Sequence, residues 1–189
     1  MRRRDSPTPR ALLDQAYPFL GIGGSLLVGA SIAAAALTYT GEHGEPYSLL
    51  NHFISELGQV GVSRNAWLFN AGLIAAGILF ILFCIGLRLS LRGIWSILGA
   101  AAGVCAGAFC SGVGVFPMND LRMHLFVAMW FFRCGLATTL LFAIGILAQP
   151  RGGARIVKSA SFFSLLAVAA YAGFLVLASV KNGRTGWTP

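Results

Sequence analysis

The sequence predicts an all-α protein, a polytopic bundle of transmembrane helices with five spans and a short interfacial amphipathic helix. Of its 189 residues 57% are hydrophobic and only 11% are charged, whereas a soluble globular domain usually carries about 25% charged residues. The mean hydropathy is +0.76. The apolar residues also gather in five runs, each long enough to cross about 30 Å of hydrocarbon. These observations exclude a soluble enzyme, a disordered chain and a free nucleic-acid-binding protein.

Each run is expected to be one helix, because none alternates apolar with polar residues as a half-buried strand does. Only the fourth run contains a charged residue, Arg133. The spans are expected at about 18–40, 66–87, 94–116, 124–148 and 159–180. The chain is then divided into a basic cytoplasmic tail, a single transmembrane domain and a short polar tail, at 1–17, 18–180 and 181–189.

The positions of the basic residues predict the orientation. Nine Lys and Arg fall in the N-terminal tail and in the second and fourth loops, against four in the first and third loops and the C-terminal tail. The positive-inside rule therefore predicts an inner (plasma) membrane protein with a cytoplasmic N-terminus and with loops one and three outside. A cleaved signal peptide is the competing interpretation, because Ala34 and Ala36 fit a small-x-small cleavage pattern. The apolar stretch is longer than an h-region of about 7–15 residues, which favours an uncleaved anchor.

The distribution of charge does not predict binding of nucleic acid, and the positions of the cysteines do not predict disulfide bonds. The net charge of +8 arises mostly from Lys and Arg at the ends of the apolar runs, where topology and anionic headgroups explain them. No basic stripe with interleaved aromatic residues appears, so nucleic acid is not an expected partner. The four cysteines all lie inside apolar runs without a CxxC motif, and we expect neither a disulfide framework nor a zinc ribbon.

Small residues recur at every fourth position of two spans, and close backbone approach along such stripes holds membrane helices together. Packing within the bundle is the first interpretation, and a homo-oligomer formed through the stripes is the alternative. The stripes are Gly21, Ser25, Gly29 and Ala33 in the first span and Gly99, Gly103, Gly107 and Ser111 in the third.

The first outer loop contains an amphipathic segment, residues 47–59, which is too short to span and is expected to lie as a helix in the membrane interface. On a helix, His52 and Glu56 are four apart and their side chains meet. The third loop repeats that spacing, because Asp120 and His124 are also four apart where the fourth span opens.

Two imidazoles and two carboxylates are a competent ligand set for zinc or a similar divalent cation. We therefore expect His52, Glu56, Asp120 and His124 to be candidate catalytic residues and candidate metal ligands. A metal there lowers the pKa of a bound water and presents it to an ester or amide at the headgroup level. Ser55 is a further catalytic candidate, as a nucleophile or an oxyanion donor.

A purely structural interpretation stands beside this one. Asp120 caps the fourth helix, His124 is an interfacial histidine, and the pair four apart in the first loop adds only a few tenths of a kcal/mol. Asn70 and Arg133 are candidate substrate-binding residues, since Asn70 lies one turn into the second span. A charge inside a span is a functional candidate by default. The expected partners of Arg133 are backbone carbonyls without a helical hydrogen bond in a neighbouring span, a lipid phosphate, Ser111 or Asn70.

Several short motifs resemble a known family. Residues 54–58 (ISELG), 69–74 (FNAGLI) and 114–117 (GVFP), followed by His124, are similar to the bacterial and archaeal membrane proteins grouped as domain-of-unknown-function family 998. That family is similar in outline to the eukaryotic Frag1/DRAM/Sfk1 membrane proteins, some of which are linked to lipid remodelling. The resemblance implies shared polar positions at the outer face: Ser55, Glu56, Gly58, Asn70, Pro117 and His124. It also implies six spans where five are predicted, so either the sequence is cut short or the last helix is absent.

The first functional hypothesis is hydrolysis or remodelling of a membrane lipid at the outer headgroup level. The alternative is a non-enzymatic protein that binds lipid or a partner membrane protein. A small transporter is the third hypothesis, although no internal repeat and no paired broken spans appear.

Overall fold

A computed structural model describes residues 8–150 and 156–185. Within these residues the chain forms five long helices and one short 3-10 helix, which joins the first two long helices. The elements are α1 (Pro9–Leu37), η1 (Ile54–Gly58), α2 (Ala66–Ser90), α3 (Ile94–Val115), α4 (Leu121–Leu147) and α5 (Ala160–Thr185).

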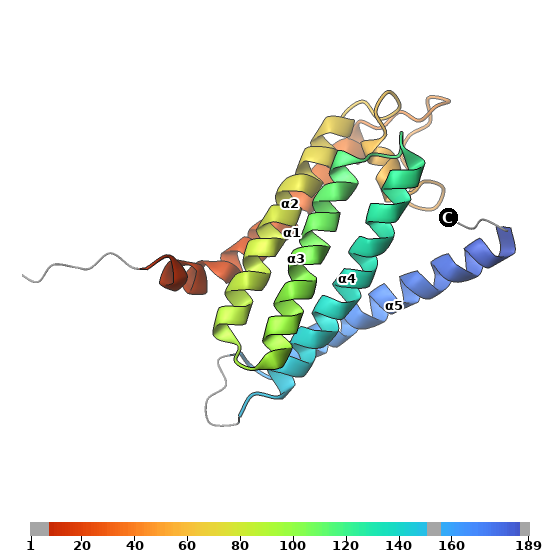
Figure 1. The fold of residues 1–189 in the computed structure, drawn as a ribbon. Helices are drawn as coiled ribbons and strands as arrows, with labels where there is room; N and C mark the ends of the chain where they lie inside the picture. Colours follow the sequence, from red (N-terminus) through yellow and green to blue (C-terminus); the bar gives the residue numbers. More distant parts are fainter. Residues whose placement is uncertain (1–7, 151–155, 186–189) are drawn as a thin grey trace, which may run out of the picture.

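The long helices that follow one another in sequence pack against each other, and α1 lies behind α2 in the view of Figure 1. In the described part of the chain the extensive helix contacts are those of α1 with α2, α2 with α3, α3 with α4 and α4 with α5, and η1 packs on α1 and α2. Helices α1 to α4 run side by side, whereas α5 leaves α4 at an angle toward its C-terminal end. The arrangement therefore brings all the loops to two ends of the molecule.

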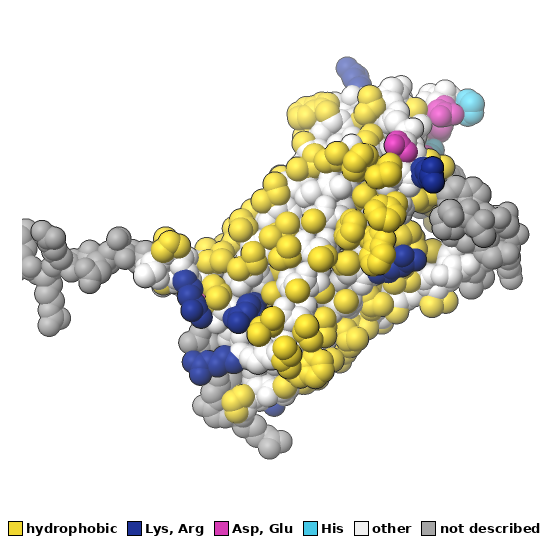
Figure 2. All heavy atoms as spheres, in the orientation of Figure 1, with side chains coloured by type: hydrophobic (Ala, Val, Ile, Leu, Met, Phe, Trp, Pro, Cys, Tyr) yellow, Lys and Arg dark blue, Asp and Glu magenta, His cyan; other side chains and the backbone are white. Residues whose placement is uncertain are grey.

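All five long helices are long and apolar enough to cross a membrane. Hydrophobic side chains cover the length of the helices, acidic side chains gather at one end, and a group of basic side chains lies at the other end (Figure 2). The protein is thus an integral membrane protein of transmembrane helices. The inner membrane and the cytoplasmic N-terminus remain predictions of the charge pattern.

The small residues of α3 confirm the packing interpretation. A Cβ at Gly103 would overlap the Cys84 side chain of α2, and one at Gly107 would overlap Ile81. Ser111 continues the stripe and donates a hydrogen bond of 3.1 Å to the Ile74 carbonyl of α2. Close backbone approach therefore joins α2 to α3, as expected where lipid supplies no hydrophobic drive between helices.

Only the first residue of the stripe predicted on α1 plays this role, because a Cβ at Gly21 would overlap the Phe83 side chain of α2. Ser25, Gly29 and Ala33 are exposed, and a Cβ at Gly29 would meet nothing within 4 Å. The residues that α1 buries are Gly24, Ser31 and Ala35. The homo-oligomer expected through the exposed stripe remains a prediction.

Helix α1 begins at Pro9 rather than at residue 18, so residues 9–17 are not a free tail. Thr8 is the N-cap, because its side chain accepts a hydrogen bond of 3.3 Å from the Ala11 amide, and a proline in the first turn suits a helix start. Pro18 lies inside the helix rather than at its start. Residues 1–7 of the predicted tail and 186–189 lie outside the described residues.

Candidate functional site

The α1–α2 connection, residues 38–65, folds over one end of the helices, and we call it the cap (Figure 1). Its small core consists of Tyr39 and Leu57, which pack with Ala35 of α1 and Phe69 of α2. Leu57 is fully buried and Tyr39 is 5% exposed. The cap is therefore anchored on α1 and α2, although only five of its residues are helical.

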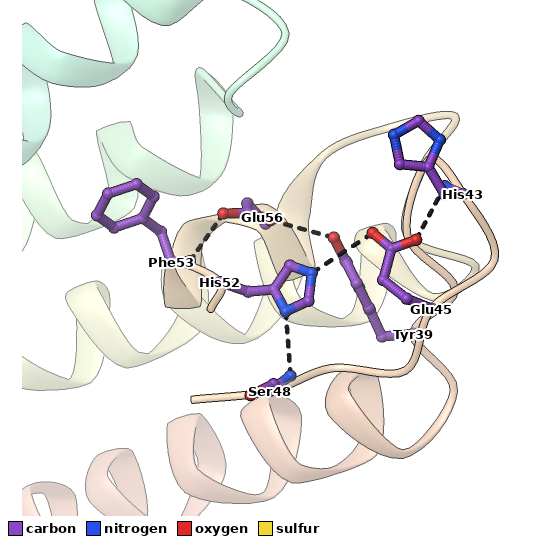
Figure 3. A network of polar contacts seen from close by, with 7 residues as sticks. All are labelled: Tyr39, His43, Glu45, Ser48, His52, Phe53 and Glu56. Carbon is purple, nitrogen blue, oxygen red and sulfur yellow. Dashed lines mark hydrogen bonds and ion pairs between the residues drawn. The ribbon is translucent and has the colours of Figure 1, made fainter. Parts of the chain in front are cut away.

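Tyr39 and Glu56 make the first half of a polar network (Figure 3). The Tyr39 hydroxyl donates to Oε2 of Glu56 over 3.2 Å. The other carboxylate oxygen, Oε1, accepts a 2.7 Å hydrogen bond from the Phe53 amide and so caps η1. Glu56 is thus held by the end of α1 and by its own turn.

His52 and Glu45 make the second half (Figure 3). Nδ1 of His52 accepts a hydrogen bond of 3.1 Å from the Ser48 amide, which assigns the ring proton to Nε2. Nε2 lies 3.5 Å from Oε1 of Glu45, and Oε2 of Glu45 accepts from the His43 amide over 2.9 Å. The imidazole also lies against the rings of Tyr39 and Tyr47, with centroids 5.3 and 5.8 Å away.

The amphipathic helix expected over residues 47–59 is reduced to η1, Ile54–Gly58. The physical reason lies in the polar side chains. His52 takes up the Ser48 amide and Glu56 takes up the Phe53 amide, so side chains replace backbone carbonyls as acceptors and favour turns over helix. The expected contact between His52 and Glu56 four residues apart is accordingly replaced by separate contacts with Glu45 and Tyr39.

Two asparagines tie the cap to the rest of the protein. Asn70 of α2 donates to the Gly58 carbonyl over 2.9 Å. Asn119, in the α3–α4 loop, accepts from the Val60 amide over 2.8 Å and donates to the Val60 carbonyl over 2.9 Å. This paired contact resembles the hydrogen bonding between two strands, and it ties the cap to the α3–α4 loop. Oδ1 of Asn70 is buried without a hydrogen-bond partner.

Ser55, predicted as a nucleophile or oxyanion donor, bridges the same two loops. Its hydroxyl lies 3.1 Å from the Met118 sulfur. A hydroxyl becomes a nucleophile when a base within hydrogen-bond reach takes its proton, and a thioether sulfur is only a weak acceptor. The contact that the structure gives Ser55 is therefore one of positioning.

Asp120 and His124 have contacts that fit the structural interpretation. Asp120 is the N-cap of α4, and its carboxylate accepts from the Met123 amide over 3.1 Å. His124 is buried, at 5% exposure, and its Nδ1 lies 2.8 Å from the Phe116 carbonyl. Both side chains thus fix the turn between α3 and α4.

Arg133 lies outside the cap, on α4. It is 12 residues beyond the first residue of the helix, which is about 18 Å along the axis. The side chain is exposed, and its guanidinium carbon lies 5.4 Å from the centroid of the Trp130 ring. Its contact is therefore a cation–π pair on its own helix, while Ser111 and Asn70 bond to backbone carbonyls elsewhere.

The cap forms most of the wall of an open pocket of about 290 Å³. Three carboxylates face it from the cap, together with the phenol of Tyr39, and Met118 contributes from the α3–α4 loop. The lining residues are Tyr39, Glu42, His43, Glu45, Glu56, Gln59, Val62 and Met118. We call it the acidic pocket, because His43 is the only basic residue of its lining.

The ionisation of two lining residues is shifted. Burial, together with the hydrogen bond to Glu56, raises the pKa of Tyr39 to about 12. The pKa of Glu45 is lowered by the hydrogen bond of its own backbone amide, against a smaller opposing effect of desolvation, and the His43 amide and His52 lower it further. At neutral pH Tyr39 is therefore a neutral donor and Glu45 an ionised carboxylate.

The predicted zinc ligands do not come together. Among the described residues, which include all four, no group of three or more His, Cys, Asp or Glu side chains could hold a metal ion. His52 and Glu56 belong to the cap network, whereas Asp120 and His124 hold the start of α4. The side chains as placed do not fit a zinc ion, and no step is derived through one.

Comparison of the sequence with known protein families assigns the chain to a family. Residues 23–188 match the model of a family described as a protein of unknown function, DUF998. The chain belongs to this family. The match covers α2 to α5, the cap and most of α1 of this DUF998 protein. No curated protein and no solved structure matches it.

The pattern of the sequence did not point to three residues that line the acidic pocket of the DUF998 protein: Tyr39, Glu42 and Glu45. Tyr39 stands two residues after α1 ends, and the two acids follow within six residues. Aromatic residues collect at membrane interfaces, so a tyrosine at the end of an apolar run followed by two acids was the available signal. The candidate pairs were predicted from residues four apart on a helix. Tyr39, Glu42 and Glu45 have no such spacing, so that search did not find them.

Proposed function

We propose that this DUF998 protein binds a membrane lipid at the cap, with a cationic amine of the lipid headgroup in the acidic pocket. The observation that carries the proposal is the lining of that pocket, in which Glu42, Glu45 and Glu56 stand around one small space. A lipid with an ethanolamine headgroup has the required chemistry, since its ammonium group offers three hydrogen-bond donors to carboxylates.

The charges of the pocket support a cation rather than an anion. Hydrogen bonds hold Glu45 in its ionised form. Glu56 accepts its two hydrogen bonds from neutral donors, a phenol and a backbone amide, so neither contact neutralises its charge. An ammonium group between these carboxylates supplies the opposite charge that the pocket lacks.

The size of the pocket and its rings support a headgroup. The volume of about 290 Å³ is at the lower end of the roughly 300–1,000 Å³ of small-molecule sites, so it suits a headgroup and not whole acyl chains. Tyr39 lines the pocket, and its ring packs on Tyr47 and His52 with centroids 5.6 and 5.3 Å away. Aromatic faces attract organic cations.

Exposed apolar side chains of the cap support contact with lipid. Leu49, Leu50 and Phe53 are 77, 95 and 63% exposed, next in sequence to the polar network. Apolar side chains displayed in this way favour insertion among the acyl chains of the adjacent leaflet. The headgroup of an inserted lipid then stands at the level of the acidic pocket.

The contacts favour binding over hydrolysis. Ser55 meets the Met118 sulfur, and His52 and His124 each bond to the backbone through Nδ1. Among the described residues no serine hydroxyl is hydrogen-bonded to a histidine, the usual means of activating a hydroxyl. The proposed activity is therefore recognition of a lipid.

Native mass spectrometry of the full chain tests the proposal. The protein carries Arg88→Gln and Arg92→Gln in every sample, which removes two arginines that attract anionic lipid at the other end of the helices. It is purified in detergent and offered equal amounts of phosphatidylethanolamine and phosphatidylglycerol with identical acyl chains. We expect the parent to retain phosphatidylethanolamine in preference to phosphatidylglycerol, and the double variant Glu45→Gln, Glu56→Gln to lose the preference.

Asp120→Asn is the matched control, because it removes one negative charge at the same end but outside the pocket, and asparagine is an equally good N-cap. The control should keep the preference. The proposal fails if the parent prefers neither lipid, or if the double variant keeps the parent's preference. Size-exclusion chromatography and helical circular dichroism verify that each variant is folded before the comparison.

A further inference from the structure

A second pocket, of about 440 Å³, lies at the opposite end of the helices from the cap. It is formed where the start of α1 meets the end of α2 and the α2–α3 turn. The lining residues are Thr8, Arg10, Ala11, Asp14, Arg88, Leu89, Leu91, Arg92 and Gly93. We call it the basic pocket.

Three arginines from two separate segments converge on the basic pocket. Arg10 comes from the first turn of α1, Arg88 from the last turn of α2, and Arg92 from the turn to α3. Asp14 is the single acid of the lining, and its carboxylate accepts a 2.6 Å hydrogen bond from the Ser90 hydroxyl. The lining therefore carries a net positive charge.

The backbone around the basic pocket adds to this field. The N-terminal ends of two helices line the pocket, that of α1 and that of α3, whose N-cap is Gly93, against the C-terminal end of one helix, α2. The N-terminal ends of helices carry partial positive charge and exposed amides. Gly93 has a φ of 98°, in the left-handed region that only glycine adopts freely, and its bend turns the chain from the end of α2 into α3.

The basic pocket lies at the level of a membrane surface. It stands at the ends of spans α1, α2 and α3, and Leu89 and Leu91 form part of its wall. Phosphate groups of lipids occupy this level. Arginine suits them because its planar fork bonds two phosphate oxygens at once.

We infer that the basic pocket binds a phosphate group, supplied either by an anionic phospholipid headgroup or by free inorganic phosphate. The site is independent of the acidic pocket in position and in charge, so this inference does not rest on the proposed function. The two pockets instead give the two ends of the protein opposite headgroup preferences.

The test uses the full chain with the acidic pocket intact. In the first arm, nanodiscs of phosphatidylcholine receive increasing phosphatidylglycerol, and the lipid that remains bound after detergent extraction is measured. In the second arm, inorganic phosphate is titrated against the detergent-purified protein by calorimetry, with chloride as the reference anion. The variants are the pair Arg88→Gln, Arg92→Gln and the pair Arg88→Lys, Arg92→Lys.

The matched control is the pair Arg64→Gln, Arg122→Gln, which removes the same charge from exposed positions at the cap end. We expect phosphatidylglycerol retention, or phosphate binding, to weaken at least about fivefold for each arginine replaced by glutamine. The lysine pair should keep part of the binding, and the control pair should match the parent.

A variant that is expected to bind more tightly completes the test, because a folding defect would not increase binding. Asp14→Asn removes the one acid of the basic pocket and should strengthen binding of the same ligand. Retention of phosphatidylglycerol without phosphate binding identifies a lipid headgroup, and phosphate binding without lipid preference identifies free phosphate. The inference is overturned if neither ligand binds the parent, or if the glutamine pair at Arg88 and Arg92 binds as well as the control pair.

Discussion

Tyr39 is the residue that joins the helices to the acidic pocket. It is buried against Leu57 and Phe69, and its hydroxyl donates to Glu56. A buried hydroxyl with a carboxylate acceptor fixes the position of that carboxylate. Tyr39 therefore sets the position of the Glu56 carboxylate relative to the end of α1.

Tyr39→Phe should keep the packing and lose this hydrogen bond. We expect the protein to lose about 1.5 kcal/mol of stability, the contribution of a hydrogen bond to a charged acceptor, and to show weaker headgroup preference. Thermal unfolding in detergent measures the first effect. An unfolding temperature equal to that of the parent would show that Glu56 is placed by η1 alone.

The ionisation of Tyr39 gives a pH dependence. Its pKa in the folded protein is raised to about 12 from 10.0. The contribution of the neutral hydroxyl is therefore complete below pH 10, and it is lost as the pH rises through about 12. Ultraviolet titration of tyrosinate should show a high-pH component that Tyr39→Phe removes. The assignment fails if the variant titrates like the parent above about pH 11.

Asn70 is a second residue whose side chain holds the cap in place. It ties α2 to the cap through the Gly58 carbonyl while its own Oδ1 stays unpaired in a buried place. Asn70→Ala should leave the Gly58 carbonyl without this donor and cost about 1–3 kcal/mol. Protease cleavage within the cap, compared with the parent, measures the loosening; equal cleavage rates would mean that Asn119 alone holds the cap.

At the scale of elements, the glycines of α3 decide how closely helices approach. Gly103→Leu should push α3 away from Cys84 of α2 and destabilise the protein by about 1–3 kcal/mol or more. Gly29→Leu on α1 is the matched control, because its Cβ meets open space. Thermal unfolding should separate the two variants, and equal effects would contradict the close packing of α3 on α2.

The same control tests the remaining prediction of a homo-oligomer. If two copies meet along Ser25, Gly29 and Ala33, then Gly29→Leu should reduce the molecular mass measured in detergent by light scattering. A monomeric parent would contradict the oligomer prediction and leave the stripe facing lipid.

The existence of the elements could be predicted because each span is a long apolar run that needs no partner to be recognised. The structure places α2, α3 and α4 within three residues of the predicted starts and ends. The start of α1 was missed because Thr8 and Pro9, an N-cap and a first-turn proline, lie in a polar stretch outside the apolar run. Local capping chemistry extends a helix beyond the residues that hydropathy detects.

The candidate site was predicted less well, and the reason is again local. A spacing of four implies contact only on a helix, and the polar side chains of residues 47–59 themselves prevent that helix. The first and third loops, in which the polar residues were predicted, do meet at one end of the helices. The observed contacts are those of Tyr39 with Glu56 and of Glu45 with His52. They depend on the conformation of the loop, which no periodic pattern in the sequence predicts.

At the scale of the whole molecule, the two ends differ in charge, with an acidic pocket in the cap and a basic pocket opposite. The positive-inside rule then predicts that the cap lies outside the cell. Arg64→Cys, at an exposed polar position of the cap, should react with a membrane-impermeant thiol reagent added to intact cells. Arg92→Cys, which is exposed at the other end, should react only after the membrane is permeabilised.

The reverse labelling pattern would overturn the predicted orientation without touching either pocket. Labelling of the parent, whose cysteines are Cys84, Cys105, Cys110 and Cys134, gives the background. Because these four lie within the helices α2, α3 and α4, we expect that background to be small.

A lipid amine in the acidic pocket is the central claim, and its most direct test is an experimental structure of the protein in nanodiscs of phosphatidylethanolamine. We expect headgroup density in the cap with its amine within about 4 Å of the Glu45 and Glu56 carboxylates. A well-resolved cap whose pocket holds only water, while lipid density is confined to the flanks of the helices, would contradict the proposed function.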